Sequence, residues 1–116
     1  GIAPRDRLWL QRARGDALIR VGRPNEARVD LTAVWQASTA GDEPFAWRPA
    51  QQAAAGLAEL DVEIGADAGA AVWIARGIDV APDVDLGERL LRHRPRLRDH
   101  WTRLTTPTLA AGRTRP

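Results

Sequence analysis

Apolar residues three and four positions apart recur across residues 57–82, and this spacing constrains the fold more than any other feature of the sequence. One helix is predicted with an apolar side formed by Ala53, Leu57, Leu60 and Ile64. A second is predicted with an apolar side formed by Ala70, Ala71, Ile74 and Ile78. Gly65 separates the two and Pro82 ends the second. Neither helix can bury its apolar side alone, so the pattern predicts an antiparallel helix hairpin.

The acidic residues of this stretch are expected away from the apolar side. By the same helical spacing, Glu59, Asp61 and Glu63 point elsewhere. Asp67 lies where a side-chain oxygen caps the second helix.

An α+β fold with two β-hairpins is the alternative, because parts of the chain also alternate with a period of two. Residues 60–64 alternate strictly, and residues 71–80 and 28–35 place several apolar residues on one parity. Helices are favoured because these segments are rich in Ala, Glu and Leu, and alanine prefers a helix to a strand by up to ~1 kcal/mol per site.

The N-terminal part predicts a similar pair of helices. The first begins at Arg5 and has an apolar side formed by Leu10, Ala13, Ala17, Leu18 and Val21. Gly22 ends it, and Pro24 suits the first turn of the next helix. The second has an apolar side formed by Ala27, Leu31, Val34 and Trp35.

The two hairpins together resemble degenerate units of the tetratricopeptide repeat family. The first unit matches the small residue, alanine and large apolar residue of that family at Gly15, Ala27 and Leu31. The second unit matches the small residue, turn, alanine, large apolar residue and closing proline at Ala58, Gly65, Ala70, Ile74 and Pro82. The units recur at 43 residues instead of 34, Asp61 stands where a large apolar residue is usual, and Thr39 replaces the first closing proline. The resemblance implies stacked helix pairs that present a groove to a protein or peptide.

A turn-forming segment at residues 38–48 accounts for the extra length between the units. Its Phe45 and Trp47 are expected to fold back onto the helices, with exposed partner anchors as the alternative. Trp73 lies beside the apolar side of the last predicted helix. Trp47, Phe45 and Trp73 are therefore the candidate partner-binding residues, and the groove they would line rests on the resemblance.

The C-terminal part predicts a capping element and a tail. Residues 86–93 predict a helix, and Leu97, Trp101 and Leu104 predict a further apolar side after Pro95. Residues 105–116 have no periodicity and predict a flexible tail, so residues 1–104 are expected to form a single helical domain. The absence of any methionine suggests a processed chain or a fragment of a larger, bacterial protein.

The sequence is poor in catalytic groups. Cysteine and tyrosine are absent, and Ser38 is the only serine and stands in no nucleophile motif. His93 and His100 are interpreted as surface residues, and the chain has no glycine-rich phosphate motif. We therefore expect a protein without a cofactor or metal, and a non-enzyme rather than an enzyme.

Arginines gather near the C-terminus. Residues 86–116 hold eight of the 17 arginines, whereas the chain carries a net charge of only +2. Arginine suits phosphate or carboxylate recognition. Binding of nucleic acid is thus an alternative function, with the candidate residues Arg89, Arg92, Arg94, Arg96, Arg98 and Arg103. The competing interpretation is a solvated or internally paired face.

The leading functional hypothesis is a non-enzymatic protein-protein interaction or regulatory module that binds a protein or peptide or associates with itself. Nucleic-acid binding is the first alternative, and a small enzyme on the α+β fold is the second. No apolar run approaches the ~18 to 20 residues needed to span a bilayer, so no membrane contact is expected and the cytoplasm is the predicted location.

Overall fold

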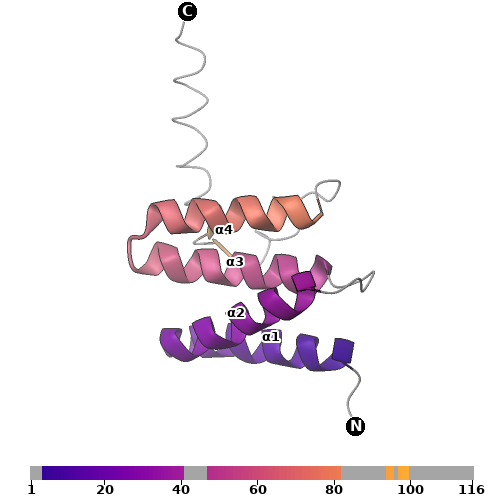
Figure 1. The fold of residues 1–116 in the computed structure, drawn as a ribbon. Coiled ribbons are helices and arrows are strands. Elements are labelled where there is room, and N and C mark those ends of the chain that lie inside the picture. The colour runs from indigo at the N-terminus through magenta and orange to yellow at the C-terminus, as the bar shows by residue number, and fades with distance from the viewer. Residues whose placement is uncertain (1–3, 41–46, 82–93, 96, 100–116) are drawn as a thin grey trace, which may run out of the picture.

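The described part of the chain is all-α. A computed structural model describes residues 4–40, 47–81, 94–95 and 97–99. They contain four α-helices, namely α1 (Pro4–Arg20), α2 (Pro24–Ala40), α3 (Trp47–Glu63) and α4 (Asp67–Val80). No strand occurs among these residues, so the α+β alternative is wrong for residues 17–35 and 60–80. Consecutive helices form antiparallel hairpins, with α1 and α2 in one layer and α3 and α4 in the next (Figure 1).

Both hairpin turns depend on a glycine with positive φ, as predicted. Gly22 has φ +79° and Gly65 has φ +75°, a region that other residues enter at a cost. The amide of the residue after each glycine donates to a carbonyl five positions back, and the glycine amide itself donates three positions back. This pair of bonds satisfies the last carbonyls of α1 and α3.

The two helix starts that follow these turns differ. Pro24 is the first residue of α2, as expected. The predicted cap by Asp67 is wrong, because Ala66 occupies the N-cap of α4 and makes no side-chain capping bond. Asp67 is instead the first helical residue, where its negative charge suits the positive end of the helix dipole.

The core consists of two clusters that follow the predicted apolar sides. One lies between α2 and α3 and is formed by Ala27, Leu31, Val34, Ala53, Leu57 and Leu60. The other lies against α3 and α4 and is formed by Ala55, Ala58, Ala70, Ile74 and Leu97. Trp73 packs against both clusters and so links the two hairpins.

The close approach of three helices explains where the predicted apolar sides fail. Leu31 of α2 lies between two glycines, so that a Cβ atom at Gly15 of α1 would stand 2.7 Å from Leu31 Cδ2 and one at Gly56 of α3 would stand 2.6 Å from Leu31 Cδ1. The buried side of α1 is therefore centred on Gly15, with Leu18 and Ile19 packed beside it. A glycine does not register as an apolar position in a periodicity count.

Several residues predicted to be inward are exposed for this reason. On α1 and its turn these are Leu10, Ala13 and Val21. Ala71 of α4 is also exposed, and Ile64 is exposed because α3 has already ended at Glu63.

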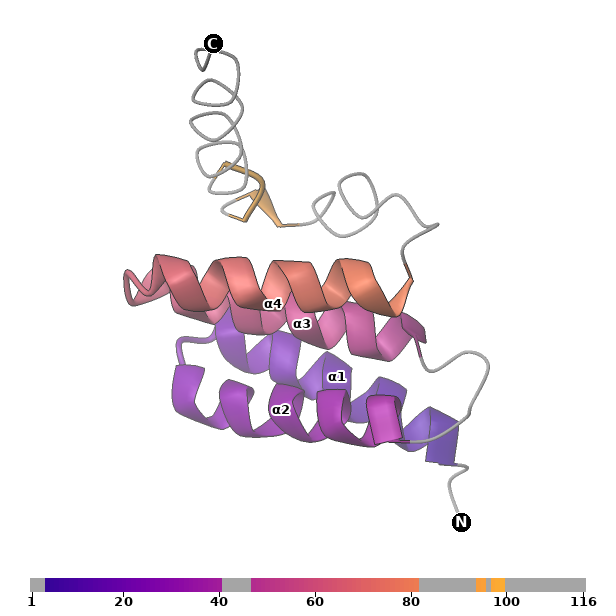
Figure 2. The same cartoon turned by 45° about the horizontal axis from the view of Figure 1, so that its top comes forward.

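A short segment, described at residues 94–95 and 97–99, lies over the layer of α3 and α4 (Figure 2). Leu97 in this segment is 1% exposed and belongs to the core, as its place in the last apolar side predicts. The predicted helix at 86–93, most of the predicted capping helix and the tail at 105–116 lie outside the described residues, as does the domain boundary at residue 104. In the part of the chain that the structure describes, no helix is long and apolar enough to cross a membrane.

Candidate interaction surface

Acidic side chains are buried between the helices, and each of them is paired with arginine. Asp30 of α2 is 3% exposed and accepts a bond from Arg14 Nε of α1 at 2.7 Å, with Gln11 Nε2 3.5 Å away. The hydrogen bond from Arg14 holds the pKa of the Asp30 carboxyl below its ordinary value, against the effect of burial. The same pairing raises the pKa of Arg14. Asp30 is therefore charged and neutralised inside the first hairpin.

A second pair joins the two hairpins. Arg28 of α2 donates to Asp61 Oδ1 of α3 at 2.8 Å, and Asp61 is 7% exposed. Gly69 of α4 leaves room for this carboxylate, since a Cβ atom there would stand 2.5 Å from Asp61 Oδ2. The expectation that Asp61 points away from the packed side is wrong, because a cation on a neighbouring helix and a missing side chain on another make its burial tolerable.

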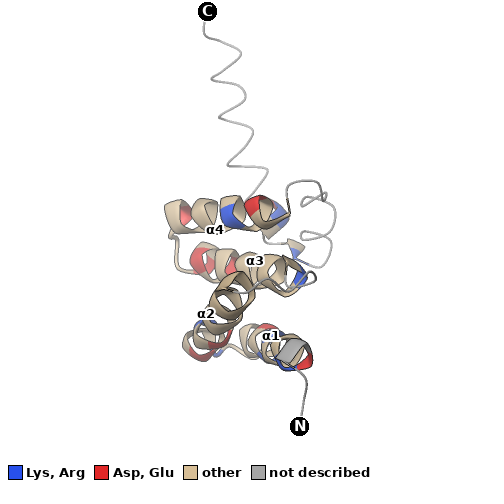
Figure 3. Ribbon diagram, turned by 45° about the vertical axis from the view of Figure 1, so that its right-hand side comes forward, with Lys and Arg blue, Asp and Glu red and all other residues tan. Residues whose placement is uncertain are grey.

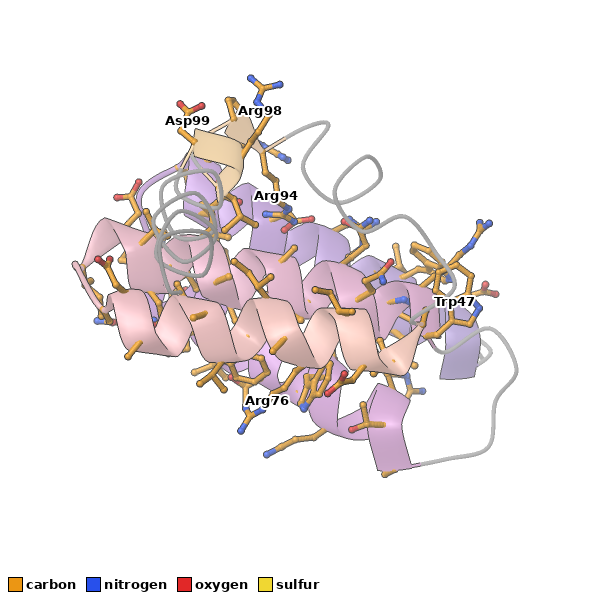
Figure 4. All side chains as sticks on the ribbon, turned by 90° about the horizontal axis from the view of Figure 1, so that it is seen from above. Trp47, Arg76, Arg94, Arg98 and Asp99 are labelled. Carbon is orange, nitrogen blue, oxygen red and sulfur yellow. The ribbon has the colours of Figure 1, made fainter. Side chains whose placement is uncertain are left out.

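A third cluster is centred on Arg94, which is 8% exposed. Its guanidinium donates to Asp16 Oδ1 of α1 at 2.7 Å and to Glu59 Oε2 of α3. Arg12 Nη1 donates to the other oxygen of Asp16 at 2.8 Å. Burial alone would lower the pKa of Arg94, but the charges of Asp16 and Glu59 raise it. We name Asp16, Glu59 and the nearby Gly56, whose missing Cβ atom would stand 3.5 Å from Asp16 Oδ1, the arginine seat. Figure 4 labels its occupant, Arg94.

Of the other arginines proposed for nucleic-acid binding, the structure describes Arg98. Arg98 is exposed and points away from the helices, next to Asp99 (Figure 4). The remaining candidates lie outside the described residues, namely Arg89, Arg92, Arg96 and Arg103. The guanidinium of Arg94 is held by carboxylates, so it is not open to a phosphate group.

The aromatic candidates lie in separate places. The Trp73 ring meets Trp35 of α2 edge to face, with centroids 5.5 Å apart, and Arg76 covers it at 4.6 Å. Trp47 is the first residue of α3 and lies apart from Arg76 (Figure 4), with Arg48 over its ring at 5.3 Å. Phe45 lies outside the described residues. Trp73 thus serves the packing of α2 on α4, and its ring is already covered.

The outer face of α2 offers a surface that sequence reasoning missed. A shallow hollow of about 440 Å³ runs along it, lined by Asn25, Arg28, Val29, Thr32, Ala33 and Gln36. A second of about 430 Å³ crosses to α1, lined by Arg14, Leu18, Arg23, Glu26, Val29 and Asp30. Val29 belongs to both and is 70% exposed. The sequence could have indicated Val29 by its position. It is an aliphatic residue two positions from both Ala27 and Leu31, which are buried residues of the same helix.

Arginines line this outer face, and each of them is paired with an acid. Arg14 and Arg23 expose 69% and 59% of their side chains, and the exposed acid beside them is Glu26, which pairs with Arg23 at 2.7 Å. Figure 3 shows the acidic residues of α3 toward its C-terminal end, and one of them, Asp61, is the partner of Arg28. The outer face of α2 is therefore aliphatic at its centre, with paired charges around it.

Chemical groups that would support catalysis are not assembled among the described residues. No group of three histidine, cysteine, aspartate or glutamate side chains in them is placed to hold a metal ion. Ser38 of α2 is buried, which keeps its hydroxyl from a substrate. The enzyme hypothesis built on an α+β fold loses its premise with that fold.

Comparisons of the chain with protein-family models, with curated proteins and with solved structures give no match. The tetratricopeptide resemblance therefore stays a prediction from the sequence. Any assignment of function rests on the surfaces described above.

Proposed function

We propose that this chain is a non-enzymatic protein-protein interaction module whose contact surface is the outer face of α2. The observation that carries the proposal is Val29, an aliphatic side chain 70% exposed at the point where two hollows meet. Single exposed aliphatic residues are ordinary on proteins, but this one lies in a concave surface with basic side chains around it.

The chemistry of the surface defines the partner. An aliphatic or aromatic side chain of a partner helix would fill the hollow above Val29 and lose its contact with water. Carboxylates flanking that side chain would meet the exposed parts of Arg14 and Arg23, whose guanidinium groups stay paired with Asp30 and Glu26. The partner we expect is an amphipathic helix with an apolar anchor and acidic neighbours.

The repeat-like arrangement supports the same proposal. Two helix hairpins stacked through α2 and α3 form the type of scaffold that the tetratricopeptide resemblance implies, and such scaffolds bind proteins through concave surfaces. Membership of that family is part of the proposal.

The test uses a charge introduced at the proposed surface and an equal charge elsewhere. Val29→Glu places a carboxylate among the expected acidic groups of the partner. Val72→Glu on α4, where Val72 is 47% exposed, is the matched control. Each variant and the wild type are first examined by sedimentation, which measures self-association. Each is then mixed with a purified candidate partner, and the complex is cross-linked and captured.

We expect Val29→Glu to weaken binding at least about 10-fold and Val72→Glu to leave it within about twofold, because only the first change lies in the contact. Equal loss in both variants would contradict the assignment of the surface. Absence of any partner and of self-association in the wild type would contradict the module itself.

A further inference from the structure

Arg94 and Leu97 differ from the other core residues, because one short turn combines a buried cation with a buried leucine. Arg94 enters the arginine seat, where Asp16 and Glu59 come from different helices. Leu97, three residues later, packs on Ala55, Ala58, Ala70 and Ile74. Residues three apart share one face of a helical turn, so both side chains reach the α-helical layer together.

The turn itself is preorganised by its sequence. The amide of Arg98 donates to the carbonyl of Arg94 at 3.0 Å, which closes one helical turn. Pro95 follows Arg94 and fixes its own φ in the helical range, and its missing amide costs nothing at the start of a turn. A preorganised turn loses little entropy when it binds.

We propose that the arginine seat and the apolar surface beside it are a recognition site for a helical turn with the pattern Arg-Pro-x-Leu, and that Arg94 and Leu97 occupy this site in cis. The trans occupant is a segment of a partner protein with the same chemistry, a cation followed three residues later by leucine. This site is separate from the outer face of α2, so either proposal can fail without the other.

The free-energy terms of this site are consistent with the replacement of the cis turn by a trans turn. A buried ion pair contributes little net free energy, because the desolvation of both partners offsets their attraction, whereas it discriminates strongly against an uncharged occupant. Leu97 supplies the apolar gain, because its side chain is almost completely withdrawn from water. The cis turn competes at the high effective concentration of a tethered segment. A trans turn is therefore expected to bind well only when the cis turn is weakened.

The first experiment uses the full-length chain with its own turn disabled. The variant Arg94→Ala with Leu97→Ala empties the site, and a fluorescent peptide of residues 93–104 is the probe. We expect this peptide to bind the emptied chain at least about 10-fold more tightly than it binds the wild-type chain, because only the emptied site is free. Adding Asp16→Asn and Glu59→Gln to the emptied chain should abolish the difference.

Peptide controls separate recognition from general stickiness. The same peptide with Ala in place of Arg94 or of Leu97 should lose the preference for the emptied chain. Equal binding of the unaltered peptide to both chains, or binding that ignores Asp16 and Glu59, would overturn the proposal. A wild-type dimer that disappears in the emptied variant would overturn the partner-protein occupant in favour of segment exchange between two copies.

A second readout does not depend on the folding of the emptied variant. The chain has no cysteine, so Leu97→Cys introduces a single thiol at a site 1% exposed. Its reaction with a thiol reagent should be at least about 10-fold slower than that of Val72→Cys. Added peptide should accelerate labelling at position 97 and not at position 72. A labelling rate at position 97 that the peptide leaves unchanged would also overturn the proposal.

Discussion

Leu31 shows how a single side chain sets the distance between three helices. Its two terminal carbons stand within 2.7 Å of the Cβ positions that Gly15 and Gly56 lack. A methyl group at position 56 would gain up to ~1 kcal/mol of helix propensity but would overpack a site with no free space, at a cost of about 1–3 kcal/mol. We therefore expect Gly56→Ala to lower the free energy of unfolding by about 1 kcal/mol in urea denaturation.

The control for this prediction removes the side chain of Leu31, which contacts position 56, before the same substitution is made. In a Leu31→Ala background the overlap is gone, so Gly56→Ala should become neutral or stabilising there, although Leu31→Ala itself costs about 2–5 kcal/mol. The same loss from Gly56→Ala in both backgrounds would show that contact with Leu31 is not its cause.

Asp30 makes the stability of the protein depend on acid pH. Its pKa lies below the ordinary 3.8, chiefly through the bond from Arg14, so the unfolded chain takes up the proton first as the pH falls. The contribution of Asp30 is present above about pH 4 and is lost as the pH falls through its lowered pKa.

The matching measurement compares the wild type with Asp30→Asn. At pH 7 we expect the wild type to be more stable by about 1 kcal/mol, a modest value because Arg14 is largely exposed. The difference should shrink as the pH falls from about 5 to 2 in urea denaturation. A difference that stays constant over this range would contradict the role of the charge.

At the scale of the elements, the two hairpin turns test backbone strain without side-chain packing. Gly22 and Gly65 have positive φ, and a Cβ atom at either position would meet nothing within 4 Å. Alanine at either position should therefore cost about 1 kcal/mol through backbone strain alone, whereas asparagine, which tolerates this region, should cost less. Thermal unfolding of the four single variants gives the comparison, and equal loss for alanine and asparagine would contradict this cause.

The sequence predicted the helices better than it predicted their orientation. Spacing of three and four residues correctly placed Ala27, Leu31, Leu57 and Ile74 inward, because apolar residues on one face of a helix are stable when that face is buried in the core. The buried side of α1 was wrong because it is centred on Gly15. A glycine gives no hydropathy signal, and its burial here depends on the leucine that packs against it from another helix.

The candidate surfaces were less predictable for a related reason. Asp61 and Arg94 appear in the sequence as ordinary charged residues, and only their partners on other helices make their burial tolerable. Those partners are 33 and 78 residues away in the chain. Val29 was similarly overlooked, because an exposed aliphatic residue acquires meaning only from the hollows on either side of it.

At the scale of the whole molecule, the question is how two hairpins stay in register. Each hairpin has a glycine turn and an internal apolar contact, but the contact between α2 and α3 joins residues far apart in the sequence. Apolar packing there is formed by alanine, leucine and valine side chains, among which Leu31 against Gly56 is specific in shape. The pair of Arg28 and Asp61 adds to the register, because only one alignment of α2 on α3 brings the buried carboxylate to its cation.

This role predicts an unequal response to removing the two charges. Arg28→Met leaves Asp61 buried without a cation, which should cost about 2 kcal/mol, at the lower end for a buried pair because Arg28 is partly exposed. Adding Asp61→Asn removes the unpaired charge and should recover about 1 kcal/mol. Arg23→Met is the matched control, since Arg23 pairs with Glu26 on the surface, and it should cost less than about 0.5 kcal/mol. Urea denaturation of the variants measures these values, and a double variant less stable than Arg28→Met would refute the argument, because the cost would then arise from lost packing at Asp61 and not from its stranded charge.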